Sequence, residues 1–277
     1  MSDKSSIEWT DATWNVSTGC TKTSPGCARC YIERTPPFRI AGRRFVKGHI
    51  PLLFHRDRLA LPRAWTKPRR VFVNSLSDLF HPDVPDQFLH EVYHVMEHNP
   101  QHQFQVLTKR AVRMRSYLDW RYGDGRIPSR HIWHGVSVEN RAMRWRINEL
   151  RKTRSRVRFV SFEPLLEDVS DGLDLAGIHW AIWGGESGPR ARLNCTDWIE
   201  RGVRQCRAQY VAPFVKQLGA NVEGLQECGD CDPCCAGQRC SLAYPIRLSL
   251  RDRKGGDIAE FPRYLRVREF PRVEVLV

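Results

Sequence analysis

Short apolar runs alternate with stretches of helical periodicity along most of this chain. The apolar runs, which predict strands, lie within residues 12–20, 69–80, 104–110, 131–140, 157–166, 178–188 and 212–219. Apolar positions recur every three to four residues, as in an amphipathic helix, within residues 86–100, 111–120, 141–153 and 196–209. Strands that alternate with helices in this way predict parallel βα units in an α/β fold.

Polar residues gather at the ends of the predicted strands, while the strands themselves are apolar throughout, as expected when both faces of a sheet are covered. In a (β/α) barrel the carboxyl ends of all strands converge on one face, whereas an open sheet converges only at its switch point. We therefore expect a partial (β/α) barrel of TIM type. The strand-end residues are Asn74, Ser75, Thr108, Lys109, Ser137, Glu139, Asn140, Ser161, Glu163, Gly184, Gly185, Glu186 and Ser187.

Three segments depart from this alternation. Residues 35–70 are rich in proline and arginine and predict a long ordered excursion over the barrel mouth. Residues 221–245 are rich in Cys, Gly and Asp and predict an inserted metal-binding module. The expected organisation is thus a barrel over 1–220, the insertion over 221–245, and a closing segment over 246–277.

Charge is the first compositional feature that narrows the function. Lys and Arg total 44 against 31 Asp and Glu in 277 residues, which gives a net charge of +13. This excess favours a polyanionic partner, nucleic acid first, although a basic and inert surface would look the same. Aromatic residues interleave with basic ones in the excursion, which suits phosphate contacts and base stacking or, alternatively, a solvated loop with apolar anchors. The basic residues there are Arg39, Arg43, Arg44, Lys47, Arg56, Arg58, Arg63, Arg69 and Arg70.

The sequence shows no signal for secretion or membrane insertion. No run of eighteen apolar residues occurs, so no membrane span is expected. The first ten residues lack a basic region followed by an apolar stretch. We therefore expect a cytoplasmic location, in which clustered cysteines more often bind metal or do chemistry than form disulfides.

Three cysteines lie close together near the start of the chain. Cys20, Cys27 and Cys30 occur in "GCTKTSPGCARCY", just after the first predicted strand. Three thiolates can bind zinc with a fourth ligand from elsewhere. They can also bind three irons of a [4Fe–4S] cluster, which leaves the fourth iron open to a small molecule.

A three-cysteine segment at a barrel mouth is similar to that of radical S-adenosylmethionine enzymes, where the open iron is chelated by the methionine group. Cleavage of that cofactor yields a 5′-deoxyadenosyl radical, which abstracts a hydrogen atom from the substrate. The gaps here are six and two residues rather than the usual three and two, and the aromatic residue, Tyr31, follows the last cysteine instead of preceding it. Zinc therefore stays open as an alternative.

Seven ordered motifs resemble the phage Gp37/Gp68 family, a group of radical-SAM-like proteins. They include "IEWTDATWNVSTGCTKTSPGCARCY", "RRVFVNSLSDLFHPDVPDQF", "WHGVSVEN" and "WAIWGGESGPRAR", and together they span about residues 5–220. The resemblance implies a partial barrel of radical SAM type with a three-cysteine cluster, and leaves the reaction open. Such chemistry also implies an electron donor such as flavodoxin or ferredoxin.

Similarity to radical SAM barrels implies roles for the strand-end residues. Cys20, Cys27 and Cys30 would be the cluster ligands, with Tyr31 beside them. Asn74, Ser75 and Asp78 would lie near the methionine amino group, and Lys109 near its carboxylate or a substrate phosphate. Ser137, Glu139 and Asn140 would face the ribose, and Gly184, Gly185, Glu186 and Ser187 would let backbone approach the adenine. Thr108 and Glu163 are further candidates for cofactor binding. Alternatively, Ser and Asn cap the following helices, the glycines only reverse the chain, and Glu163 pairs with a nearby arginine.

A second group of cysteines lies in the insertion, at Cys228, Cys231, Cys234, Cys235 and Cys240. Repeated CxxC steps in a loop with few apolar residues indicate a metal that holds its shape. Zinc bound by four of the five is one interpretation, a second iron–sulfur cluster is another, and unbound thiols are the third.

The combined features predict a radical S-adenosylmethionine enzyme that acts on a nucleic-acid base, in modification or repair. A base inside a duplex is poorly accessible, so an extruded or single-stranded nucleotide is expected. Two alternatives remain: a non-catalytic, zinc-stabilised nucleic-acid-binding protein, and radical chemistry on a protein or small-molecule substrate.

Overall fold

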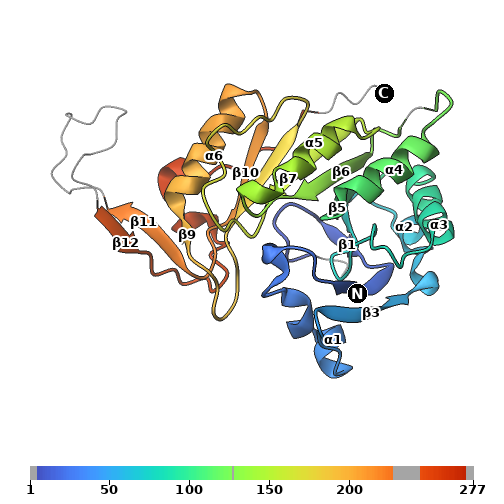
Figure 1. Cartoon of the computed structure of the whole chain (residues 1–277), viewed down its shortest axis with the longest axis horizontal. Coiled ribbons are helices and arrows are strands. Elements are labelled where there is room, and N and C mark those ends of the chain that lie inside the picture. Colours follow the sequence, from blue (N-terminus) through green and yellow to red (C-terminus); the bar gives the residue numbers. More distant parts are fainter. Residues whose placement is uncertain (1–4, 127, 227–243, 273–277) are drawn as a thin grey trace.

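A computed structural model describes residues 5–126, 128–226 and 244–272. Its centre is a seven-stranded sheet in the order β1-β4-β5-β6-β7-β8-β10 (Figure 1). The strands are β1 Ala12–Trp14, β4 Arg70–Val73, β5 Gln103–Thr108, β6 Ile132–Ser137, β7 Val157–Phe162, β8 Trp180–Gly184 and β10 Ala212–Gln217. Every neighbouring pair in it is parallel.

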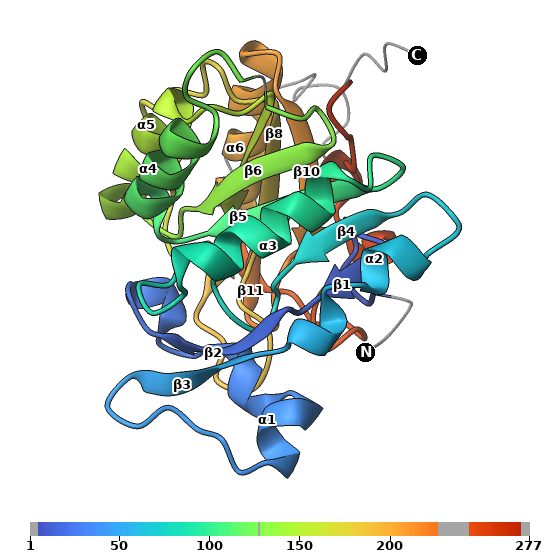
Figure 2. The same ribbon diagram turned by 90° about the vertical axis from the view of Figure 1, so that its right-hand side faces the viewer.

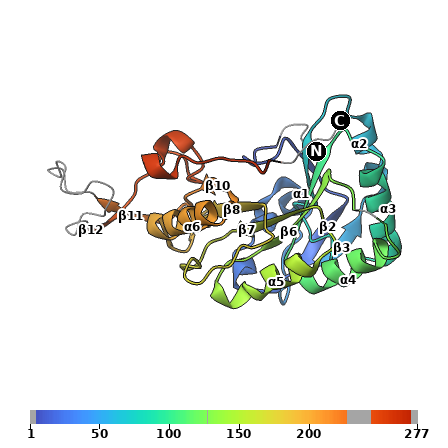
Figure 3. The same ribbon diagram turned by 90° about the horizontal axis from the view of Figure 1, so that it is seen from above.

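The strand order follows the chain without reversal, so the sheet has no switch point of the doubly wound kind. Helices cover its outer face (Figures 2 and 3). They are α3 Asp86–Glu97, α4 Ala111–Arg121, α5 Trp145–Lys152 and α6 Thr196–Ala208. The result is a curled half-barrel of βα units, which confirms the expected fold class.

The two faces of the sheet bury different side chains, because successive residues of a strand point to opposite sides. Val71 and Val106 belong to the large core beneath the helices. Phe72, Trp133 and Trp180 belong to a second, aromatic-rich cluster on the concave side. Each such aromatic contributes on the order of 1.5–3 kcal/mol by its burial. The concave side is therefore a packed core.

The first predicted strand is in fact two. Only β1 joins the large sheet, whereas β2 (Ser17–Thr21) pairs with β3 (His49–Phe54) in a separate antiparallel sheet. The chain turns at Asn15, whose Oδ1 accepts from the backbone N–H of Leu76 at 2.9 Å. Cys20 therefore lies on the small sheet, beside the half-barrel.

The proline- and arginine-rich excursion is ordered and connects the small sheet to β4. It contains α1 Pro36–Ile40, β3 and α2 Leu61–Ala64. Prolines at the start of α1 suit a first helical turn, where the missing N–H is not needed.

The last described residues run along β10. Val215 N–H donates to the carbonyl of Val267 at 2.8 Å, and Glu269 N–H donates to Pro213 O at 2.9 Å. This pairing covers the edge of the half-barrel. A third sheet has the order β12-β11-β9, with β9 Asn194–Cys195, β11 Val222–Gln226 and β12 Tyr244–Arg247.

The five cysteines from Cys228 to Cys240 lie outside the described residues, so metal binding by them stays a prediction. None of the helices in the described ranges combines the length and the apolar character that crossing a membrane requires.

Candidate functional site

The three cysteines fall on one segment, residues 20–31, which we call the cysteine loop. Cys20 lies in β2, Cys27 ends a short 3-10 turn, and Cys30 immediately precedes another. All three thiols are partly buried. Cys20 and Cys30 pack against one small apolar core that contains Phe38 and Ile50.

The thiols share one electrostatic environment. Burial, the largest effect, raises the pKa of Cys20 to about 12, and the charges of Asp78, Cys27 and Cys30 add to the rise while Arg110 opposes it. Burial likewise raises the pKa of Cys30, with Cys27 adding to it. Cys20 and Cys30 thus both respond to the charge of Cys27. Binding a metal here would have to release the Cys20 proton.

Cationic side chains surround these thiols. A guanidinium nitrogen of Arg110 lies 3.9 Å from the Sγ of Cys20. Lys109 and Lys22 both act to lower the pKa of Cys30, and Lys22 Nζ also donates to Ala28 O at 2.9 Å. Positive charges placed in this way stabilise thiolates.

Glu139, just after β6, anchors one side of the cysteine loop. Its Oε1 accepts from the Ser24 hydroxyl and, at 3.2 Å, from the Gly26 N–H. A Cβ on Gly26 would lie 2.7 Å from that oxygen, so only glycine permits this approach. Its Oε2 accepts from Arg146 at 2.8 Å, and both side chains are almost fully buried. Burial acts to raise the pKa of Glu139, but Lys109 and Arg146 outweigh it and the pKa is lowered, so the anchor is anionic.

Glu186, after β8, anchors the other side through Arg192. The Nε of Arg192 donates to Glu186 Oε2 at 2.9 Å, and Nη1 donates to the Pro25 carbonyl at 2.9 Å. Arg29 adds an ion pair to the same carboxylate at 3.7 Å. The cysteine loop is therefore fixed to residues that follow two different strands of the half-barrel, at their carboxyl ends.

Asp78 connects the ends of β4 and β5 to the cysteine loop. It accepts from the Thr108 hydroxyl at 2.6 Å, from Lys109 N–H at 3.2 Å and from Arg110 at 2.7 Å. Arg110 in turn donates to the carbonyl of Thr21 at 2.9 Å. Asp78 and Thr108, both predicted to bind the cofactor, are thus hydrogen-bonded to each other.

Asn74, Ser75 and Tyr31 form a second connection. Asn74 has a positive φ of 71° and exchanges hydrogen bonds with Ser17: Nδ2 donates to Ser17 Oγ at 2.8 Å, and Oδ1 accepts from Ser17 N–H at 3.1 Å. Ser75 Oγ donates to Asn15 Oδ1 at 3.1 Å, and the Tyr31 hydroxyl donates to the Ser75 carbonyl. These contacts hold the cysteine loop against the end of β4.

Two further strand-end residues have local partners. The Asn140 side chain accepts from Met143 N–H at 3.2 Å and so caps a 3-10 turn, which was the alternative interpretation of such residues. Glu163 forms an ion pair with Lys216 of β10.

The remaining predicted residues lie at the ends of β6 and β8. Ser137 is buried, and its carbonyl accepts from Arg146 at 2.8 Å. Gly184 ends β8, and Gly185 packs so closely on the Leu218 carbonyl that a Cβ would collide with it. Ser187 follows, partly buried. Gly185 therefore serves the close approach of β8 to β10.

The sequence reasoning missed the cationic partners of the predicted carboxylates. Arg110 directly follows the predicted Lys109, so the strand-end argument extends to it. Lys216 is the one charged residue of β10, and a cation within a largely apolar strand indicates a nearby anionic partner. Arg146 and Arg192 gave no comparable signal, because their partners are set only by the tertiary fold.

The type of donor suits thiolate ligation, because one short loop bears three partly buried thiols and nearby cations compensate negative charge. Across the described ranges, no three His, Cys, Asp or Glu side chains are grouped closely enough to hold a metal ion. The assignment of Cys20, Cys27 and Cys30 as ligands thus stays a prediction.

The chain belongs to a family described as "Protein of unknown function (DUF5131)", whose model matches residues 4–242. No curated protein matches it. Among solved structures, it is similar to spore photoproduct lyase complexed with dinucleoside spore photoproduct, with 15% identity and a TM-score of 0.43 over 75% of this chain and 63% of that chain. A point mutant of the same lyase has 14% identity and a TM-score of 0.43, over 72% and 62%. This chain thus covers less than two thirds of the length of either.

Proposed function

We propose that this member of the DUF5131 family is a radical S-adenosylmethionine enzyme that modifies or repairs a nucleic-acid base. One observation carries the proposal: a loop that bears three thiols is fixed to the carboxyl ends of strands in a parallel half-barrel. Those ends are where barrel enzymes build their active sites. The family whose model matches the chain has no described function, so the motif resemblance to the phage Gp37/Gp68 family stays a prediction.

Three thiols on one loop are the number and type of donor that this function requires. Cys20, Cys27 and Cys30 would bind three irons of a [4Fe–4S] cluster. Lys22, Lys109 and Arg110 would offset the negative charge of the thiolates, as their effects on the thiol pKa values indicate. With S-adenosylmethionine, the cluster would supply the one-electron chemistry that forms a 5′-deoxyadenosyl radical.

The protein's own residues would fix the ligands and the mouth of the half-barrel. Glu139 and the Glu186–Arg192 pair hold the cysteine loop, so the thiols keep their position. Lys109 directly follows β5, and its charge acts to lower the pKa of both Cys30 and Glu139. It is our candidate for the cofactor carboxylate or a substrate phosphate.

The substrate class follows from charge and chemistry. A net charge of +13 favours a polyanion. Hydrogen abstraction from a base requires that base to leave the duplex or to be single-stranded. The reaction would also need an electron donor, such as flavodoxin or ferredoxin, and a reducing cytoplasm.

Anaerobic purification followed by iron, sulfide and zinc analysis tests the proposal. We expect the wild-type protein to absorb near about 400 nm and, with a reductant and S-adenosylmethionine, to release 5′-deoxyadenosine. Cys30→Ala should lower the iron content by about four per chain and abolish this release. Cys195→Ala, in β9 and outside the cysteine loop, is the matched control and should do neither.

A protein that binds stoichiometric zinc in the cysteine loop and never yields 5′-deoxyadenosine would overturn the proposal. In that case the zinc-stabilised nucleic-acid-binding alternative would replace it.

A further inference from the structure

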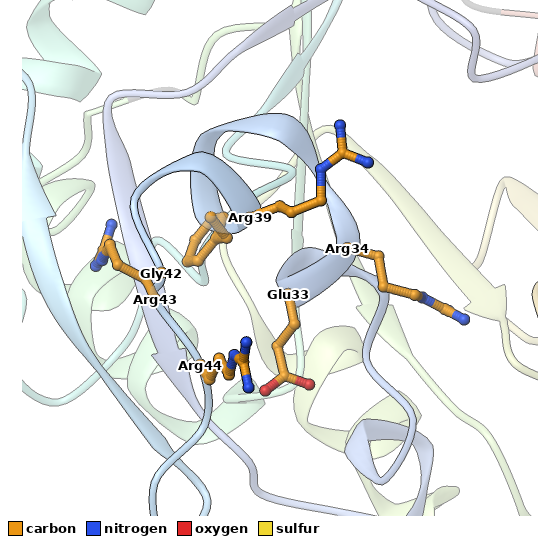
Figure 4. A pocket seen from close by; sticks show the side chains of 7 residues that line it. Glu33, Arg34, Arg39, Gly42, Arg43 and Arg44 are labelled. Atoms are coloured by element: carbon orange, nitrogen blue, oxygen red, sulfur yellow. The ribbon is translucent and has the colours of Figure 1, made fainter.

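A depression of about 400 Å³ lies beside the cysteine loop, and four arginines line it (Figure 4). Its volume falls within the range of about 300–1,000 Å³ that is common for ligand sites. Arg34 and Arg39 come from the turn Tyr31–Arg34 and from α1, while Arg43 and Arg44 come from the segment after α1. Glu33 is the single acidic residue in the lining, which leaves a net charge of +3.

None of these four arginines forms a salt bridge with a carboxylate among the residues that the structure describes. Elsewhere in the described chain, arginines commonly pair with carboxylates, as Arg121 does with Glu97 at 2.6 Å. Arg43 donates instead to the Thr18 hydroxyl at 2.9 Å, and the Arg34 guanidinium lies against the backbone of Gly188.

Arg39 and Arg44 are exposed, and within the described residues neither guanidinium forms a salt bridge or hydrogen bond. Glu33, whose Oε1 accepts from Phe45 N–H at 2.7 Å, offsets one of the four positive charges. The depression thus keeps an excess of positive charge that an anionic ligand would balance.

The depression and the cysteine thiols contact the same small apolar core. Phe38 lines the depression and also belongs to the small core on which Cys20 and Cys30 pack. Arg43 stacks over the Phe38 ring at 4.9 Å and binds Thr18, two residues before Cys20. A ligand that contacts the arginines would therefore lie next to the cysteine loop.

We infer that this depression, lined by residues 33–44, binds the phosphates of a single-stranded nucleic acid and so positions a nucleotide at the cysteine loop. The inference rests on the proposed function and names how its substrate is held. Guanidinium forks match phosphate oxygens in geometry and charge.

Exposed apolar side chains that are close in sequence to the lining residues favour a nucleic-acid strand over a small phosphate. Ile40 directly follows Arg39 at the end of α1, and Val46 lies two residues after Arg44; they leave 82% and 71% of their surface exposed. Tyr31, between Cys30 and Arg34 in the chain, leaves 45% exposed. Bases can lie against such surfaces while arginines hold the backbone, whereas inorganic phosphate would use the arginines alone.

The test is the salt dependence of binding to a fluorescein-labelled single-stranded oligodeoxynucleotide, measured by anisotropy with anaerobically purified full-length protein. The variant is Arg39→Ala/Arg44→Ala. For a single strand, the plot of log binding constant against log salt concentration has a slope of about 0.7 per neutralised phosphate. The variant lacks two arginines, so the magnitude of its slope should be about 1.4 smaller than that of wild type. Arg204→Ala/Arg207→Ala, in α6 on the outer face, removes the same charge and should leave the slope unchanged. Equal melting temperatures would show that all three proteins are folded.

Equal slopes in wild type and Arg39→Ala/Arg44→Ala would overturn the inference, as would an equal loss in the α6 control. Unlabelled strand should displace the probe, and ATP at the same phosphate concentration should not; displacement by ATP would make this a free-nucleotide site and also overturn it. The readout is independent of catalysis. If the slope falls in Arg39→Ala/Arg44→Ala but the wild-type protein never forms 5′-deoxyadenosine, the inference stands and the proposed function is refuted. If the wild-type protein forms 5′-deoxyadenosine but the slope does not fall in the variant, the proposed function stands and the inference is refuted.

Discussion

Removal of the Glu139 carboxylate should release the cysteine loop. In Glu139→Ala, the Ser24 hydroxyl and the Gly26 N–H lose their acceptor. Arg146 loses the carboxylate at 2.8 Å while it remains almost fully buried.

The expected cost is large because a charge is left without its partner. Breaking a buried ion pair by removing one member costs about 3–5 kcal/mol. The two contacts to the cysteine loop, each to a charged acceptor, account for on the order of 1.5–3 kcal/mol apiece in general. Since about 1.4 kcal/mol corresponds to tenfold in an equilibrium, and the Glu186–Arg192 anchor remains, local opening of the loop should increase at least about tenfold.

Thiol alkylation mapped by mass spectrometry measures this opening site by site. In the metal-free protein, under native conditions, Cys27 and Cys30 should react at least about tenfold faster in Glu139→Ala than in wild type, if opening is fast and precedes modification. Cys206, which is buried on the inner face of α6, should change little.

The matched control is Glu97→Ala, which breaks the pair with Arg121 between α3 and α4. It removes a carboxylate–arginine contact elsewhere and should leave Cys27 and Cys30 at their wild-type reactivity. If Glu139→Ala and Glu97→Ala gave the same alkylation rates at these two cysteines, Glu139 would not be an anchor of the loop.

Three further outcomes are expected from the packing and the charges. Burial lowers the pKa of His134 from 6.5 to about 3, so the folded state favours the neutral imidazole. The contribution of His134 to the free energy of unfolding is therefore complete above pH 6.5 and falls by about 1.4 kcal/mol per pH unit between pH 6.5 and 3. Urea unfolding between about pH 7 and about pH 5.5 should therefore show about 1.4 kcal/mol less pH dependence in His134→Asn than in wild type, and an unchanged dependence would contradict this. Gly202→Ala should destabilise by about 1–3 kcal/mol despite a better helix former, because its Cβ would collide with the Trp183 ring; a raised melting temperature would refute that reasoning. Arg192→Ala removes the guanidinium contacts to Glu186 and to the Pro25 carbonyl, leaving the backbone N–H of residue 192 and the longer Arg29 ion pair on that carboxylate; it should increase trypsin cleavage within the cysteine loop, whereas wild-type proteolysis would show that this anchor is dispensable.

The strands and the fold class were predictable because their signal is local. The run at 131–140 contains β6, and the run at 157–166 contains β7. Consecutive apolar residues with polar ends suffice to identify strands buried on both faces. The split of residues 12–20 into β1 and β2 was not predictable, because the turn depends on Asn15 binding Leu76, sixty-one residues away.

The candidate site was predictable in its location but not in its internal bonding. Strand-end reasoning selected Asp78 and Glu139 as polar groups at the mouth. It could not show that Asp78 binds Arg110 or that Glu139 accepts from Ser24 and Gly26, because those pairs join segments distant in sequence. The sequence alone does not distinguish a carboxylate that pairs with another part of the protein from one that is free to bind a ligand.

The cysteine loop is synthesised well before the residues that anchor it. Ser24 reaches Glu139 across 115 residues, and Pro25 reaches Arg192 across 167. A ribosome therefore releases the three thiols long before it has made the residues that fasten them. During that interval the nascent segment is accessible to iron-delivering proteins and to oxidants alike, and completion of β8 and the residues that follow it ends this exposure.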